Sequence, residues 1–311
     1  MTDSHKPNDV NKMSRRDFVK TGLASAVALV LGGLTRKDAL AANSFYFGTD
    51  SDTASCTYPC GMPQDFYIGK TGVGTLIDST YFNKTAALQC PTVYSVHTYW
   101  WLCGSTSIYR PAGYKTNYAW GKAQGKAACD AWYNSPVSNY FYGKTIFANV
   151  EDKSGWLEDG SAASKLVNRA VLQGFLDAVA TYVSSGVNPG FVPGIYTRAN
   201  IWQPYFGTTG YRTPRPAVLW LTGCGCSPLV TCAPSDITCT GTLAQAKNVM
   251  ENRMGKTVLG GNMAVIWQYY FTGDPKSCYK DSGDYDISIN QSGSHTFNPN
   301  TSTSNWNWKN C

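Results

Sequence analysis

Residues 144–152 read KTIFANVED, and this stretch decides how the rest of the chain is interpreted. Most positions in 144–151 are apolar, β-branched or aromatic, which predicts a β-strand. Side chains two positions apart on a strand face the same side, so Phe147, Asn149 and Glu151 are expected in one row. Ala148 and Val150 are expected on the opposite face, against helices. The strand therefore has one face that ends in an amide and a carboxylate.

Strand and helix patterns alternate on both sides of this stretch. Strands are predicted at residues 44–48, 65–69, 92–99, 144–151, 191–197, 217–222 and 264–270. Helices are predicted at 117–133, 161–185 and 243–254, with Gly186 as the C-terminal cap of the second. Strands alternating with helices indicate βαβ units and a parallel sheet. We expect residues 43–290 to form one α/β domain, a (β/α)8 barrel of regular or irregular form.

The first 41 residues have the organisation of an export signal. The segment 14–20 (SRRDFVK) contains the pair Arg15 and Arg16, an apolar run covers 23–34, and residues 39–41 (ALA) supply a cleavage site. This order resembles the twin-arginine signal pattern, which export machinery reads as an address. An uncleaved amphipathic anchor is the alternative. We expect the protein to be exported to the periplasm or the cell exterior, with the twin-arginine machinery as a partner.

Charge and hydropathy exclude some classes of partner. The chain has a formal net charge of +6, and without residues 1–41 it keeps 19 basic and 16 acidic residues, a net +3. This weak excess gives no case for nucleic-acid binding, although it is compatible with an anionic cell-wall polymer. No segment after the signal is long and apolar enough to span a membrane. The oligomeric state is left open by the sequence.

The cysteines favour an oxidising compartment. There are 11 cysteines, all after residue 41, and such usage in an exported protein predicts disulfides. Because the number is odd, at least one thiol is free, ligated or intermolecular. Cys224, Cys226, Cys232 and Cys239 lack the paired C-x2-C spacing of zinc ribbons, so we predict a disulfide-tied loop there and no metal. Residues 291–311 read as a Ser/Thr/Asn-rich tail.

Acidic residues at the ends of the predicted strands are the candidate catalytic groups. Active sites of parallel α/β barrels lie at the carboxyl ends of the strands. Asp50 closes the first predicted strand, Glu151 closes the fourth, and Asp286 follows the last. A carboxylate enclosed by apolar walls is suited to general-acid chemistry. A structural glutamate satisfied by backbone donors is an equally open interpretation of Glu151.

Several short motifs together carry a family resemblance. In chain order they are FGTDSDT at 47–53, FANVE at 147–151, QGF at 173–175, GIYT at 194–197, VLW at 218–220 and IWQY at 266–269. Their order resembles the family 25 glycoside hydrolases, which are N-acetylmuramidase lysozymes. The opening motif is more similar still to exported glycoside-hydrolase-like domains of unknown function related to that family. The resemblance spans nearly all of the chain after the signal.

The resemblance implies roles for four residues. Glu151 corresponds to the acid of family 25, and Asp50 and Asp286 correspond to its aspartates on the first and last strands. Asn149 stands where the family has an aspartate, and an amide cannot act as a proton donor or as a negative charge. Glycosidases need two carboxylates, so Asp50, Asp286 or the acetamido group of the substrate must assist Glu151. Otherwise the barrel binds glycan without cutting it.

Aromatic residues supply candidate contacts for sugar rings. The chain is 14% aromatic, with 10 Trp and 20 Tyr, and aromatic surfaces stack on the C–H faces of sugars. Together with Asn149, the candidates for substrate binding are Trp100, Trp101, Tyr196, Trp220, Trp267 and Tyr269. Ordinary core packing is the alternative for most of them.

The remaining motifs narrow the function. His97 has no paired ligand at a metal-binding spacing and is predicted to be packed or hydrogen-bonded. No esterase elbow, phosphate loop or zinc-protease motif occurs, and we expect no cofactor. The favoured function is glycosidase-like action on amino-sugar polymers of the cell envelope, of the peptidoglycan type. A catalytically inactive glycan-binding barrel and an envelope interaction protein are the alternatives.

Overall fold

The computed structural model describes residues 44–51, 65–79, 95–135, 142–207, 210–222, 243–270 and 284–290. The predicted signal peptide (1–41), the cysteine-rich loop around 224–240 and the C-terminal tail (291–311) lie outside these residues. Within the described residues, no helix is long and apolar enough to cross a membrane.

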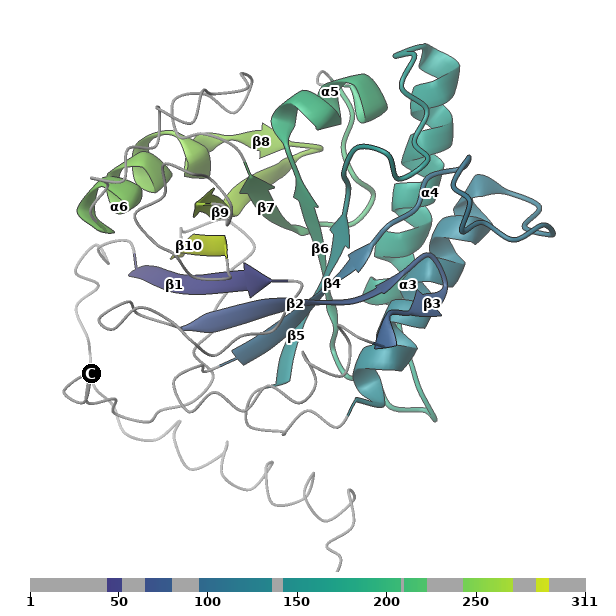
Figure 1. Ribbon diagram of the computed structural model, residues 1–311, viewed down its shortest axis with the longest axis horizontal. Coiled ribbons are helices and arrows are strands. Elements are labelled where there is room, and N and C mark those ends of the chain that lie inside the picture. The colour runs from purple at the N-terminus through teal and green to yellow at the C-terminus, as the bar shows by residue number, and fades with distance from the viewer. Residues whose placement is uncertain are drawn as a thin grey trace, which may run out of the picture. The chain divides into compact units, whose positions relative to one another are not determined.

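Eight of the described strands pair side by side in a ring (Figure 1). They are β1 (Ser44–Ser51), β2 (Phe66–Val73), β4 (Ser95–Trp101), β5 (Tyr142–Asn149), β6 (Val192–Thr197), β7 (Val218–Thr222), β9 (Asn262–Tyr270) and β10 (Asp284–Asn290). The parallel order β1-β2-β4-β5-β6-β7-β9 accounts for seven of them. The ring closes through β10, which pairs with both β9 and β1. The expected α/β architecture with a barrel-like sheet is therefore present.

Strand β10 is where the sheet departs from a regular (β/α)8 pattern. It runs antiparallel to both of its neighbours, whereas a regular barrel has eight parallel strands. Antiparallel neighbours need no crossover helix between them, and β10 is the next described element after β9. Asp286 was expected to follow the last strand. It lies instead within β10. Alternating apolar residues at 285, 287 and 289 are the sequence pattern that indicates it.

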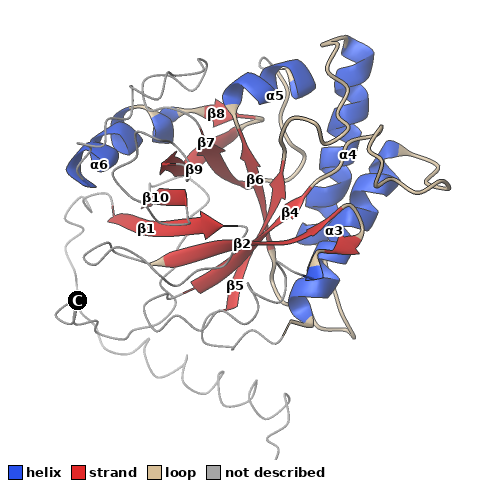
Figure 2. Cartoon of the chain, viewed as in Figure 1, coloured by secondary structure: helices blue, strands red, loops and turns tan. Residues whose placement is uncertain are grey.

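Four α-helices accompany the described strands, and α3 and α4 lie side by side along one flank of them (Figure 2). They are α3 (Asn117–Tyr133), α4 (Ala162–Ala180), α5 (Ala199–Phe206) and α6 (Leu243–Asn252). Short pieces complete the description: β3 (Leu76–Ile77), β8 (Val258–Leu259) and the 3-10 turn η2 (Met254–Lys256). Helix α3 has the bounds that the sequence predicts. Thr116 and Ser161 cap α3 and α4 by accepting hydrogen bonds from Ala119 N and Ser164 N.

Helix α4 ends earlier than the sequence predicts. Its last residue is Ala180, and Gly186 does not cap it. Ser184 and Val187 instead form a two-residue bridge, with Val187 N donating to Ser184 O over 2.8 Å. Gly186 lies inside this turn with φ = 77°, a conformation that favours glycine. The run of β-branched, aromatic and hydroxyl side chains at 181–185 has low helix propensity, which explains the early end.

The apolar side chains form two clusters on opposite faces of the sheet. The outer cluster packs between the strands and the helices, and it includes Ala148 and Val150. The interior cluster fills the ring, and its members are Phe66, Ile68, Phe147, Tyr196, Val218, Trp220, Val265 and Ile266. The predicted alternation along 146–150 is therefore confirmed. Gly194 makes room for the interior ring of Phe147, which would lie 2.3 Å from a Cβ at that position.

Candidate functional site

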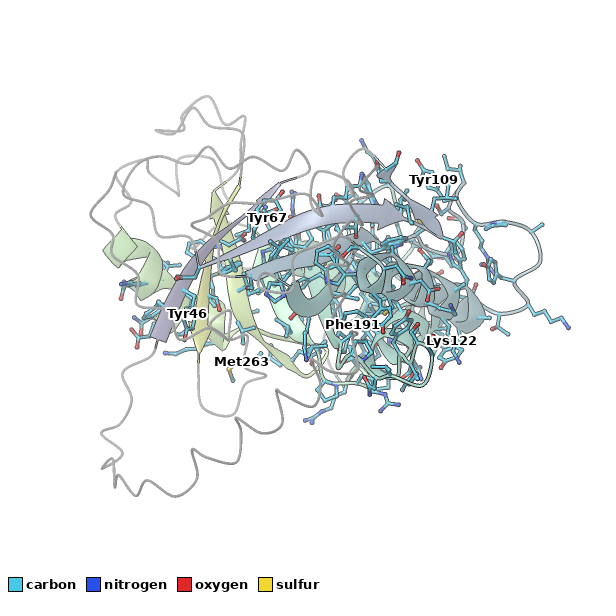
Figure 3. The ribbon with its side chains drawn as sticks, turned by 90° about the horizontal axis from the view of Figure 1, so that it is seen from below. Tyr46, Tyr67, Tyr109, Lys122, Phe191 and Met263 are labelled. Atoms are coloured by element: carbon cyan, nitrogen blue, oxygen red, sulfur yellow. The ribbon has the colours of Figure 1, made fainter. Side chains whose placement is uncertain are left out.

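One inward-facing side chain from each strand of the ring lies at the end where the parallel strands finish. Lys70, Asn149 and Gln268 each follow a member of the interior cluster by two positions, and Tyr196 and Trp220 are themselves members. We call this set the mouth ring. Its members are Asp50 (β1), Lys70 (β2), Trp101 (β4), Asn149 (β5), Tyr196 (β6), Trp220 (β7), Gln268 (β9) and Asp286 (β10). Figure 3 shows Tyr109, in the β4–α3 connection at this end, far from Tyr46 in the first half of β1.

Gln268 links two members of the mouth ring. Its Nε2 donates to Asp50 Oδ1 over 2.7 Å, and its Oε1 accepts from the Tyr196 hydroxyl over 2.7 Å. All three residues are buried. A buried amide that uses both its donor and its acceptor fixes the rotamers of both neighbours. Asp50 is therefore held in one orientation at the mouth.

Asp286 has a different environment. Its Oδ1 accepts a 2.8 Å hydrogen bond from Trp220 Nε1, and the residue is fully buried. The Trp220 ring packs edge-on against Tyr196 and Phe147, with centroids 4.3 and 5.3 Å away. This aromatic packing holds the indole N–H in place, and so it holds Asp286.

Strand register brings Asp50 and Asp286 to the same face of neighbouring strands. Asp286 pairs with Gly48 in the antiparallel ladder, so Asp50 is its diagonal neighbour. Diagonal neighbours in antiparallel pairs lie about 7–8 Å apart. Both aspartates are candidate catalytic groups by sequence, and the register brings them to neighbouring positions on one face.

Glu151 extends the row of Phe147 and Asn149 one step beyond β5. Val150 N donates to Tyr196 O over 2.9 Å, which continues the strand ladder to the residue before Glu151. Glu151 itself is partly exposed. Burial raises the pKa of Tyr196 well above its usual value, and the negative charges of Glu151 and then Asp50 raise this pKa further. The two carboxylates therefore act on the same phenol.

The loop after Glu151 is fixed at several points. Ser154 Oγ accepts from Trp101 Nε1, and Ser154 O accepts from Gly104 N over 2.7 Å. The Tyr205 hydroxyl lies 3.2 Å from Asp152 Oδ1 and 2.8 Å from Glu158 Oε1, two acids of the same loop. Such anchors on both sides limit the positions that Glu151 can take.

Asn149 is the departure from the expected pair of acids. It is 5% exposed, and its Oδ1 has no hydrogen-bond partner among the described residues. It pairs with Trp101 on one side and Tyr196 on the other, so its side chain lies in the mouth ring. An enclosed amide oxygen of this kind is an acceptor for a ligand N–H.

The aromatic candidates divide into two groups. Trp101, Tyr196 and Trp220 belong to the mouth ring, and Trp101 is partly exposed. Trp100 is fully buried, with Nε1 donating to Gly74 O over 2.8 Å, and Trp267 packs in the outer cluster. The structure does not bring these two indoles to the mouth, because each follows the opposite row of its strand. The side chain of Tyr269 lies outside the described residues.

Sequence reasoning missed two members of the mouth ring. Lys70 follows Ile68 and Gln268 follows Ile266 by two positions, so both continue interior rows. The period of two along each strand was the signal that would have found them. Gln268 was part of a family motif but received no role, and Lys70 lies just past the expected end of its strand.

His97 is hydrogen-bonded, as predicted. Its Nδ1 accepts from Thr145 N over 3.2 Å and its Nε2 lies 2.9 Å from Ser95 Oγ. Burial lowers the pKa of His97 to about 3, so the ring is neutral. No group of three potential ligands for a metal occurs among the described residues.

Two cysteines lie among the described residues, and neither forms a disulfide. Cys103 and Cys129 are buried and unbridged, and burial raises the pKa of both. A buried thiol with a raised pKa is inert. The other nine cysteines lie outside the described residues.

Comparisons with known proteins give structural neighbours only. No protein-family model and no curated protein sequence matches the chain. A family 25 glycosyl hydrolase from Bacillus anthracis has a TM-score of 0.46 at 12% identity, over 78% of this chain and 88% of that one. A family GH25 lysozyme from Aspergillus fumigatus has a TM-score of 0.45 at 16% identity, over 79% and 94%. A bacterial lysozyme from Streptomyces coelicolor has a TM-score of 0.42 at 15% identity, over 81% and 94%.

The first two of these structures belong to the family that the sequence motifs resemble. At such low identity they say nothing about which side chains react.

Proposed function

We propose that this protein is glycosidase-like and acts on amino-sugar polymers of the cell envelope, with Glu151 as the general acid. One observation carries the proposal: Gln268 joins Asp50 to the Tyr196 hydroxyl, and the hydrogen bond from Val150 N to Tyr196 O lies one residue before Glu151, so both acids adjoin Tyr196 at the carboxyl ends of the barrel strands. Two carboxylates on one enclosed polar site are the minimum that glycoside hydrolysis requires. The partly exposed position of Glu151 lets it reach a glycosidic oxygen.

The second acid in this proposal is Asp50. Asp50 is 7% exposed and its Oδ1 is oriented by Gln268, whereas Asp286 is fully buried and bound by Trp220. A nucleophile or base must reach the sugar or its attacking water, so the more accessible aspartate suits this role.

The substrate class follows from three features. The motif resemblance points to N-acetylmuramidases, and Trp101 offers a partly exposed indole for a sugar ring. The enclosed Oδ1 of Asn149 suits the N–H of an acetamido group, which distinguishes amino sugars from plain hexoses. An acetamido group held there is also placed to assist hydrolysis itself.

Turnover by a Glu151→Gln variant tests the proposal. Purified wild type is expected to release reducing sugar from peptidoglycan, and the variant is expected to lose this activity by a factor of about 100 or more. Glu251→Gln, at an exposed glutamate of α6, is the matched control and should keep full activity. Unchanged activity in Glu151→Gln would rule out this residue as the acid.

A glycan-binding protein without activity is the second candidate, and Asn149 is the observation that favours it. With an amide in place of the family carboxylate, the pair nearest to the substrate is incomplete. Glycan binding by both wild type and Glu151→Gln, with no turnover by either, would establish this function. An absence of glycan binding would point instead to an envelope interaction protein.

We also propose that residues 1–41 direct export through the twin-arginine pathway. Replacing Arg15 and Arg16 by lysine should abolish export, because the receptor reads the paired guanidinium groups. The measurement is the fraction of full-length precursor that stays in the cytoplasm. Normal export of this double variant would contradict the assignment.

A further inference from the structure

Lys70 is a cation in a mouth that otherwise carries acids. It continues the interior row of Phe66 and Ile68 along β2, and it pairs in register with Tyr99 of β4. Among the described residues that are buried and polar, it is the one with an ammonium or guanidinium group. A buried cation costs free energy and needs a partner or a function.

The contacts of Lys70 define a small site with Trp101. Its Nζ lies 3.3 Å from Asp78 Oδ2 and 5.0 Å from the centroid of the Trp101 ring. The indole N–H of Trp101 is taken by Ser154 Oγ, so the ring is held from both sides. The Lys70 side chain is 11% exposed and that of Asp78 is 24% exposed, so the acid has the freer access to water.

The charges around the mouth decide where an anionic group on a sugar can lie. The negative charges of Glu151 and Asp50 repel an anion on their side of the ring. The ammonium group of Lys70 attracts an anion. Trp101, next to Lys70, pairs in register with Asn149, which lies two residues before Glu151. In a site of low dielectric these interactions fix the orientation of a bound ligand more strongly than they do in water.

We infer that Lys70 and Trp101 form a subsite for a sugar that carries an anionic substituent, with its ring on the indole and its anion at the ammonium. This subsite rests on the proposed glycan function and deepens it, because it selects acidic sugars and sets their direction across the mouth. Lysine acts as a point charge, so carboxylate and phosphate share the required chemistry. Asp78 competes with the ligand for Lys70 and turns to water when the ligand binds.

Calorimetric binding to the purified protein tests the subsite with three probes. They are an oligosaccharide of N-acetylglucosamine and N-acetylmuramic acid, the same oligosaccharide with its carboxylates converted to methyl esters, and a phosphorylated chito-oligosaccharide. Lys70→Met is expected to weaken binding of the acidic oligosaccharide about 10- to 100-fold and to leave the ester unchanged. Asp78→Asn is expected to strengthen binding of the acidic oligosaccharide, because it removes the competitor.

The opposite directions of these two variants separate binding from folding. A purely structural ion pair would make both variants weaken every probe equally, and that result would overturn the subsite. Lys126→Met, at an exposed lysine that also pairs with an acid, is the control. If Lys70→Met does not fold, Asp78→Asn alone decides. The inference is then overturned if Asp78→Asn binds the acidic oligosaccharide no more tightly than wild type does.

The probes also distinguish the source of the anion and the level at which the inference fails. Preference for the phosphorylated probe over the carboxylate would assign a phosphate-bearing glycan. Binding by wild type that is equal for acid and ester would reject the subsite and leave glycan binding intact. If no probe binds, the glycan function is rejected together with the subsite. Loss of turnover in Glu151→Gln would support the glycan function independently of the subsite.

Discussion

Gln268 Nε2 donates a hydrogen bond to Asp50 Oδ1 over 2.7 Å, joining the last parallel strand of the ring to the first. The assignment of the amide ends follows from chemistry, because a carboxylate accepts only and the Tyr196 hydroxyl needs an acceptor. The acid that we propose as the partner of Glu151 is thus positioned by a residue that itself has no catalytic chemistry.

Replacing Gln268 by leucine should destabilise the protein and loosen Asp50. Asp50 loses a buried donor and Tyr196 loses an acceptor, and each loss costs roughly 1–3 kcal/mol. We expect the midpoint of thermal unfolding to fall by several degrees. Gln203→Leu, at an exposed position of α5, is the control and should change stability by less than about 0.5 kcal/mol. Equal midpoints for the two variants would show that the linkage contributes nothing.

The row along β5 shows what the sequence could predict. Alternation between Phe147 and its neighbours required only the period of a strand, and the cluster in which each apolar side chain packs follows this period. Strand β10 was missed because Asp, Ser and Asn have low strand propensity, although this strand is paired on both edges. The apolar residues at 285, 287 and 289 were the local signal for this strand, and its pairing on both edges outweighs the low propensity of the residues between them.

The composition of the mouth ring illustrates the other limit. Asp50, Asn149 and Asp286 were found because each lies near the expected end of a strand. The contact between Gln268 and Asp50 joins residues 218 positions apart in the chain, and only ring closure creates it. Trp100 and Trp101 were both candidates, but neighbouring residues of a strand face opposite sides. Trp100 therefore packs in the outer cluster, and Trp101 belongs to the mouth ring.

His97 predicts how stability depends on pH. Its pKa is about 3 in the folded protein, below the value of about 6.5 in an unfolded chain. The unfolded chain therefore binds a proton first as the pH falls. The contribution of His97 to the free energy of unfolding is fully present above pH 6.5 and is lost between about 6.5 and 3. The slope from this group is about 1.4 kcal/mol per pH unit. Denaturant unfolding at several pH values measures it.

Two substitutions isolate the titration of His97 from its hydrogen bonds. His97→Asn removes the titrating group, so the loss of stability between pH 6.5 and 4 should become shallower by about one proton. Ser95→Ala removes one hydrogen-bond partner but keeps the imidazole, so it should lower stability evenly at each pH in this range. An unchanged slope in His97→Asn would mean that other groups cause the acid sensitivity.

The close contact between helices α3 and α4 should make a glycine-to-alanine substitution destabilising. A Cβ at Gly121 would lie 1.8 Å from the backbone oxygen of Val171, and that oxygen belongs to a helix that cannot yield locally. Glycine to alanine stabilises an exposed helix by about 0.5–1 kcal/mol, whereas Gly121→Ala should destabilise this protein by about 2 kcal/mol or more. Lys122→Ala, at an exposed neighbour, should be nearly neutral in the same urea titration. A stabilising Gly121→Ala would contradict the close helix contact.

Tyr205 is expected to affect the rate of turnover although it does not contact the substrate. Its hydroxyl binds Asp152 and Glu158, which belong to the loop after Glu151. Tyr205→Phe should therefore lower kcat about tenfold and leave KM nearly unchanged, because the acid is less well oriented. Tyr182→Phe loses a comparable 2.8 Å bond to Asp130, on the surface of α3, and should leave both constants as in wild type. Equal kinetic changes in the two variants would point to a general loss of stability.

Asn149→Asp decides whether the missing carboxylate limits activity. The side chain is 5% exposed, and the residue precedes Glu151 by two positions on the same strand row. A carboxylate there would restore the pair of acids that glycoside hydrolysis uses, so we expect turnover of peptidoglycan to rise about tenfold or more. Burial favours the protonated form of the new acid, so the variant should lose stability as the pH rises above about 4. Asn248→Asp, on the exposed side of α6, is the control for added charge and should change neither quantity. A folded Asn149→Asp variant that binds glycan but gains no turnover would favour a barrel that recognises its polymer without cleaving it.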